Sequence, residues 1–153
     1  MSKPEFVYVT YIETTPEKLW EALTNSEFSK RYWFDTEVRS DWKMGSSFAL
    51  VTDGIISDTG EILEADPPRR LAYTFKHERF EEMRDEAATK VTFAIEPHGG
   101  IVKLTVTHEG FAAGSKLLGA VSNGWPAILS GLKSLLETGH AVAIPMEALG
   151  KIR

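Results

Sequence analysis

The sequence predicts one α+β domain, in which a long antiparallel sheet packs against a single long helix near the C-terminus. Three observations support this fold class. The chain has 153 residues, a size typical of one domain. Short segments of alternating polar and apolar residues fill its middle, and a helical apolar period follows them. We therefore expect one domain over residues 1–153, with a core at 5–139 and an irregular tail at 140–153.

The N-terminal part predicts one strand followed by two short helices. Residues 5–13 are rich in β-branched and aromatic side chains, as strands are. A helix should start at Thr15, because its hydroxyl can cap the first turn and Pro16 suits the first helical position. We expect Ser26 to cap a second short helical turn that leads to Trp33.

The middle of the chain, residues 36–109, predicts about six further strands. Asp53-Gly54 and His98-Gly99-Gly100 indicate hairpin turns, since glycine accepts the positive φ that tight loops require. Pro67-Pro68 should interrupt the sheet, because proline has no amide to donate to a ladder. Strands with one buried and one wet face are typical of antiparallel sheets, and six or seven twisted strands tend to curl around a helix.

One acidic segment, residues 78–88, separates two of these strands. We interpret it as a solvated loop. A mobile lid is the alternative, because Phe80 and Met83 would give the segment an apolar underside.

A long amphipathic helix is predicted after Gly110, from apolar residues that recur between 117 and 136 with a period of 3.6. Pro126 leaves two alternatives: the helix kinks there, or one piece ends near Ser122 and a second starts at Asn123. Gly139 should end the helix as a C-cap.

Short motifs spread over residues 5–139 give the chain a family resemblance. In order they are Thr15-Pro16-Glu17-Lys18-Leu19-Trp20-Glu21-Ala22-Leu23-Thr24, Trp33-Phe34, Trp42-Lys43-Met44-Gly45, Gly60-Glu61-Ile62-Leu63-Glu64, Pro67-Pro68-Arg69-Arg70-Leu71, His108-Glu109-Gly110-Phe111 and Gly124-Trp125-Pro126-Ala127-Ile128-Leu129. Together they resemble the heat-shock-protein-90 ATPase activator-like family of the START and birch-pollen-allergen (SRPBCC) superfamily. The resemblance implies a helix-grip fold, in which a curved antiparallel sheet of six to seven strands wraps a long C-terminal helix around a hydrophobic cavity.

Composition excludes several classes of function. The chain has no cysteine, which excludes disulfide scaffolds, thiolate metal sites and cysteine nucleophiles. A net charge of −5 argues against nucleic acid or an anionic membrane as the main partner. Because the start lacks a secretory signal and no apolar run could span a membrane, we expect a cytoplasmic protein without stable membrane insertion.

The sequence offers no strong catalytic or cofactor motif. The four histidines lie too far apart for paired zinc ligands, so we expect no metal and no cofactor. His77 and His108, near predicted strand ends, are weak candidates for acid–base chemistry. A carboxylate base is the alternative, and the carboxylates on or beside predicted strands are Glu13, Glu61, Glu64, Glu96 and Glu109.

Aromatic residues, eight Phe, four Trp and four Tyr, are the most informative group, because large rings either fill a core or line a cavity. The predicted cavity residues are Trp33, Trp42, Phe48, Tyr73, Phe75, Phe93, Phe111, Val121, Trp125 and Leu129. Helix glycines, which remove side-chain volume for a cavity or for close packing, are Gly119, Gly124 and Gly131.

These features favour the binding of a small apolar ligand, such as a lipid, polyketide or aromatic metabolite, between the sheet and the C-terminal helix. Two alternatives stay open. One is a cyclase- or dehydratase-like enzyme that uses His77 or His108 on a polyketide-type substrate. The other is a protein-interaction or co-chaperone-like module that uses the acidic segment 78–88.

Overall fold

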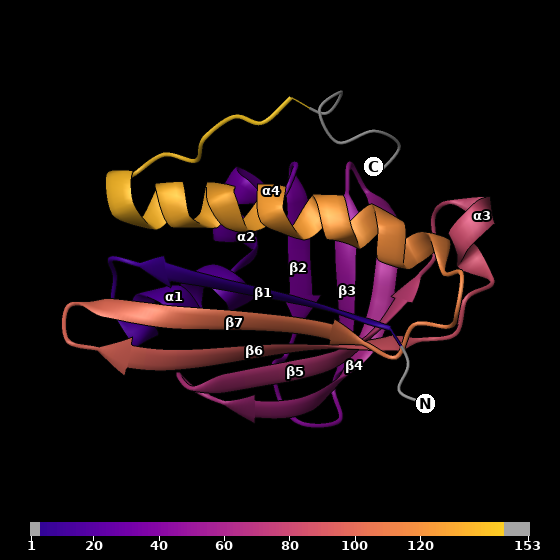
Figure 1. The fold of residues 1–153 in the computed structure, drawn as a ribbon, viewed down its shortest axis with the longest axis horizontal. Coiled ribbons are helices and arrows are strands. Elements are labelled where there is room, and N and C mark those ends of the chain that lie inside the picture. The colour runs from indigo at the N-terminus through magenta and orange to yellow at the C-terminus, as the bar shows by residue number, and fades with distance from the viewer. Residues whose placement is uncertain (1–3, 146–153) are drawn as a thin grey trace.

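A computed structural model describes residues 4–145, which form a seven-stranded antiparallel sheet that curves beneath one long helix (Figure 1). This architecture confirms the predicted α+β helix-grip fold, with two short helices after the first strand. In chain order the elements are β1 (Glu5–Ile12), α1 (Pro16–Thr24), α2 (Ser26–Tyr32), β2 (Thr36–Ser40), β3 (Ser47–Thr52), β4 (Ile55–Asp66), β5 (Arg70–His77), α3 (Glu81–Arg84), β6 (Thr89–His98), β7 (Ile101–Glu109) and α4 (Lys116–Thr138).

The sheet has the strand order β1-β7-β6-β5-β4-β3-β2, so every strand except β1 pairs beside a neighbour in sequence. The two predicted hairpin turns are confirmed. Asp53 and Gly54 both have positive φ, 51° and 78°, between β3 and β4. His98 pairs with Ile101, which leaves a two-residue turn between β6 and β7. β1 forms the edge of the sheet opposite β2 and pairs along its whole length with β7.

The two short helices begin where side chains can cap them. The Thr15 hydroxyl accepts a hydrogen bond from the Lys18 amide at 3.2 Å, as predicted for α1. For α2 the prediction of a Ser26 cap is wrong. The Asn25 side chain instead accepts from the amides of Glu27 and Phe28, and Ser26 is the first helical residue. Asparagine is at least as good a cap as serine, and here it stands one position earlier.

The long helix α4 is continuous from Lys116 to Thr138 and contains Pro126 in its interior. The alternative of two separate pieces is therefore wrong. Proline removes one hydrogen bond from the helix ladder, but the residues around it, including Trp125 and Ile128, are buried against the sheet and hold the helix together. Gly139 ends α4 with φ of 94°, as predicted.

The core lies between the concave face of the sheet and α4, and it contains the alternating strand residues that the pattern predicted. Val91, Phe93 and Ile95 of β6 are all buried, as is the apolar face of β7. Within residues 4–145 no helix combines the length and apolarity that a membrane span requires. Residues 140–145 of the predicted tail have no helix or strand, and its remainder, 146–153, lies outside the described residues.

Candidate functional site

A small void lies beside the N-terminal half of α4, where this helix meets the end of β5 and the short helix α3. Figure 1 shows α3 next to this end of α4. The void has a free volume of about 10 Å³, roughly the space that one water molecule needs. Its lining residues are Trp33, Phe75, His77, Met83, Leu117, Ala120, Val121, Gly124, Trp125 and Ile128.

Four of the ten predicted cavity residues line this void: Trp33, Phe75, Val121 and Trp125. The other six lie elsewhere in the structure. Those that are buried in the core are Phe48, Tyr73, Phe93, Phe111 and Leu129. Trp42 is partly buried and packs on the edge of the core.

The predicted aromatic residues pack against one another as a continuous chain of rings. Phe48 and Tyr73 stack with centroids 4.0 Å apart, and Phe93 follows at 5.8 Å from Tyr73. Trp125 continues the chain at 5.9 Å from Phe93, and Trp33 lies 5.4 Å beyond it. Distances of this size are ordinary for packed aromatic pairs. Most of the predicted cavity is therefore filled by rings, and the free space lies at the Trp33–Trp125 end.

The three helix glycines have three different surroundings. Gly124 lines the void. At Gly131 an added Cβ would lie 3.2 Å from the Tyr32 carbonyl oxygen, so this glycine permits close packing of α2 and α4. Gly119 is exposed, and a Cβ there would have no neighbour within 4 Å.

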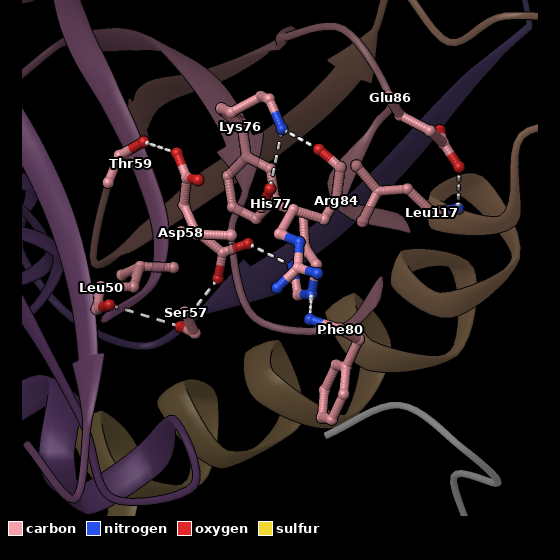
Figure 2. A network of polar contacts seen from close by, with 12 residues as sticks. Leu50, Ser57, Asp58, Thr59, Lys76, His77, Phe80, Arg84, Glu86 and Leu117 are labelled. Atoms are coloured by element: carbon pink, nitrogen blue, oxygen red, sulfur yellow. Dashed lines mark hydrogen bonds and ion pairs between the residues drawn. The ribbon is translucent and has the colours of Figure 1, made fainter. Parts of the chain in front are cut away.

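His77 reaches the void from the end of β5 and belongs to a buried polar network (Figure 2). Its Nδ1 lies 2.8 Å from a carboxylate oxygen of Asp58, and its Nε2 accepts from the Phe80 amide at 2.9 Å. The second oxygen of Asp58 accepts from the Ser57 hydroxyl at 2.9 Å. Because Nε2 is an acceptor, the ring proton is assigned to Nδ1, which donates to Asp58. Asp58 thus fixes the tautomer and orientation of His77.

His108 lies on β7 and is fully buried away from the void. Its Nδ1 accepts from the Trp125 indole N–H at 3.1 Å, and its Nε2 lies 2.7 Å from the Thr89 hydroxyl. Thr89 in turn donates to the Phe75 carbonyl at 3.0 Å. Burial lowers the pKa of His108 to about 3, because the charged imidazolium would lose its hydration there. Both weak catalytic candidates therefore have protein partners at both ring nitrogens.

Trp33 follows α2, lines the void and carries an indole N–H without a partner among the described residues. The residue is 2% exposed, and its Nε1 is a buried side-chain nitrogen for which residues 4–145 supply no hydrogen-bond partner. A buried N–H without a partner carries a penalty of roughly 1–3 kcal/mol. The neighbouring Trp125 does not carry this penalty, because its indole N–H bonds to His108.

The acidic segment 78–88 is anchored to the fold at several points and contains the helix α3. Met83 of α3 is buried and lines the void, and the Phe80 ring stacks on His77 with centroids 5.6 Å apart. The apolar underside expected for a lid is therefore present. Figure 2 shows two further anchors, from Lys76 to the carbonyl of Arg84 and from Glu86 to the start of α4.

Glu86 caps α4 from outside the helix. One carboxylate oxygen accepts from the amides of Lys116 and Leu117 at 3.0 and 3.2 Å, and the other accepts from the Ser115 hydroxyl. Free amides and the helix dipole both favour a negative charge at this position.

Replacing Glu86 by alanine should lower the free energy of unfolding by about 1 kcal/mol, the usual effect of losing a helix cap. Urea denaturation followed by circular dichroism measures this change. Glu82→Ala is the matched control, because Glu82 lies exposed in the same segment, and it should shift stability by less than about 0.5 kcal/mol. Equal losses in the two variants would contradict the capping role of Glu86.

Comparison with protein families assigns the chain to one of them. The model of the family described as "Activator of Hsp90 ATPase homolog 1-like protein" matches residues 13–137, which is most of the chain. The chain belongs to this family. The resemblance seen in the sequence motifs is thereby confirmed. A comparison with curated protein sequences found no match.

Solved structures similar to this family member share its fold. The protein MLL2253 from Mesorhizobium loti is 26% identical, with a TM-score of 0.75, over 87% of this chain and 96% of its own. PFC0360w, an HSP90 activator from Plasmodium falciparum, is 24% identical, with a TM-score of 0.72, over 86% and 95%. CalU16 from Micromonospora echinospora is 22% identical, with a TM-score of 0.71, over 88% and 77%. The last two likenesses bear on the fold alone.

Sequence reasoning missed two residues that shape the site of this family member. Asp58 is absent from the carboxylates that the sequence suggests as a base, yet it is fully buried and holds His77. Aspartate is depleted in strand interiors, so its position inside a predicted strand, between Ser57 and Thr59, is an available signal. The sequence suggests Met83 only for the underside of a lid, and nothing in the pattern predicts that it lines one void with Trp33 and Val121.

Proposed function

We propose that this protein binds a small, largely apolar molecule, such as a lipid, polyketide or aromatic metabolite, in the void between the sheet, α3 and α4. The observation that carries the proposal is the lining of this void. Most of its lining side chains are apolar, and those with polar atoms are His77, Trp33 and Trp125. Apolar walls with a small number of polar groups are typical of ligand sites.

Ligand entry requires the void to widen, since its free volume is about 10 Å³. The short helix α3 borders the void, and its segment can move outward only when the anchors at Phe80, Arg84 and Glu86 loosen. α3 has four residues, and its buried contact with the void is the side chain of Met83. Methionine is flexible and adapts to irregular surfaces. We propose that outward movement of α3 withdraws Met83 and opens space for the ligand.

Intrinsic fluorescence offers a direct test, because Trp33 and Trp125 line the void. A panel of lipids, flavonoids and aromatic polyketides should contain compounds that change this fluorescence and raise the melting temperature, since a ligand that binds only the folded state stabilises it. A panel that leaves both signals unchanged would contradict the proposed function.

Val121→Phe should block the void and weaken the binding of any compound identified in this way by about tenfold or more, the equivalent of 1.4 kcal/mol. The larger ring points into space that the ligand needs, because Val121 is a lining residue. Titration of fluorescence or calorimetry gives the dissociation constant.

Leu118→Phe is the matched control for this variant. Leu118 lies on the same helix outside the lining, so an added ring there should leave the dissociation constant within about twofold, a change below 0.5 kcal/mol. Equal loss of binding in V121F and L118F would place the ligand elsewhere.

Met83→Ala should strengthen binding, because truncation enlarges a buried apolar space that can then accept a ligand.

A further inference from the structure

The unpaired indole N–H of Trp33 bears on what the ligand must contain. Trp33 lines the void and is 2% exposed. Its Nε1 has no hydrogen-bond partner among residues 4–145. Buried polar groups in folded proteins are nearly always paired, so an exception calls for an explanation. A ligand site is such an explanation, because the protein then supplies the donor and the bound ligand supplies the acceptor.

The other polar groups of the lining already have partners. The Trp125 indole N–H donates to His108 at 3.1 Å. Both nitrogens of His77 are engaged, by Asp58 at 2.8 Å and by the Phe80 amide at 2.9 Å. Among the described side chains that line the void, the donor without a partner is therefore the indole N–H of Trp33.

The ligand's acceptor should be electrically neutral. The lining described for the void contains neither lysine nor arginine, and a carboxylate or phosphate buried without a cation is strongly disfavoured. A carbonyl oxygen has the right chemistry, since it accepts hydrogen bonds and carries no charge. The surrounding rings of Phe75 and Trp125 favour an aromatic or alicyclic body on the same molecule.

We infer that the ligand is a neutral ring compound with a carbonyl group, such as an aryl ketone or lactone, whose oxygen accepts the hydrogen bond from Trp33 Nε1. This inference rests on the proposed function and narrows its ligand class. It makes Trp33 the residue that distinguishes a carbonyl compound from a plain hydrocarbon of the same shape.

A pair of probes isolates this hydrogen bond: 1-tetralone, a bicyclic aryl ketone, and tetralin, which has the same carbon skeleton without the carbonyl. The dissociation constants of both are measured by calorimetry for the wild type, Trp33→Phe and Trp20→Phe. The W33F variant keeps a ring and removes the donor. The W20F variant makes the same change on α1, outside the lining, and serves as the matched control.

The expected result is a change in the ratio of the two dissociation constants. Relative to tetralin, binding of 1-tetralone should weaken by about threefold to tenfold in W33F, the range of one net hydrogen bond. The same ratio should stay at the wild-type value in W20F. Comparing a ratio between variants cancels the different hydrophobicities of the two probes and any general loss of packing.

Three outcomes overturn the inference, and they separate it from the proposed function. If both probes bind and W33F leaves the ratio unchanged, the inference fails while ligand binding stands. If tetralin binds and 1-tetralone does not, the carbonyl is excluded and apolar binding again stands. If neither probe binds the wild type and the panel described above also fails, the proposed function fails together with the inference.

A second measurement on the wild type applies even where W33F does not fold. The indole N–H signal of Trp33 is observed by nuclear magnetic resonance and assigned through its contacts with Trp125, whose ring centroid lies 5.4 Å away. The signal should move downfield when 1-tetralone is added and should not do so with tetralin. Equal shifts with both probes contradict the inference.

Discussion

Acidification should destabilise this protein through His108. In the folded state burial lowers the pKa of His108 from 6.5 to about 3, whereas in the unfolded chain the imidazole titrates near 6.5. Below that pH the unfolded state binds a proton that the folded state does not bind, so the stability present above pH 6.5 is progressively lost as the pH falls toward 3. Between pH 6.5 and about pH 4 the loss is about 3 kcal/mol.

His108→Gln tests this assignment. A glutamine can accept from the Trp125 indole through its carbonyl and donate to Thr89 through its amide, and it does not titrate in this range. The variant should be less stable near neutral pH. Below pH 6.5 its free energy of unfolding should fall less steeply, because its unfolding takes up about one proton fewer. His140→Gln is the control, because His140 is exposed. Urea denaturation at several pH values measures the slopes, and identical slopes for the wild type and H108Q would refute the assignment.

Gly60→Ala should cost about 3–5 kcal/mol, which places it among the most damaging single substitutions. Gly60 lies on β4, and a Cβ there would stand 1.9 Å from the backbone carbonyl oxygen of Thr74 on β5. Two backbones cannot yield as a flexible side chain can, so the strands must separate. The cost extends to the core, because Gly60 pairs with Phe48, whose ring stacks on Tyr73.

Gly100→Ala is the matched control for this substitution. Gly100 lies in the turn between β6 and β7, and a Cβ there would meet no atom within 4 Å. The free energy of unfolding of the G100A variant should stay within about 0.5 kcal/mol of the wild-type value. The midpoint of urea denaturation and the yield of soluble protein compare the two variants. A G60A protein as stable as G100A would contradict the close approach of β4 and β5.

The fold could be predicted because its signals are local. Alternation in β5, β6 and β7 and the 3.6 period of α4 each depend on residues a few positions apart. Pro126 was harder to place, since whether a helix continues through proline depends on tertiary packing. Here burial of Trp125 and Ile128 decides it.

The site could be predicted only in part, because it depends on contacts between distant segments. The pattern identified inward-facing rings, but it could not show that Phe48 and Tyr73 stack at 4.0 Å and fill the space between them. Nor could it bring Asp58 to His77, 19 residues apart in sequence and 2.8 Å apart in space. The unpaired N–H of Trp33 is a property of the packed state alone.

We expect a small molecule to enter beneath α3 and to contact the lining of this void. Nuclear magnetic resonance of the protein with methyl labels and bound 1-tetralone tests it most directly. Through-space contacts are expected from the ligand to the methyl groups of Met83, Val121 and Ile128, which all line the void. Contacts confined to exposed apolar residues, such as Val7 and Val9 on β1, would contradict it.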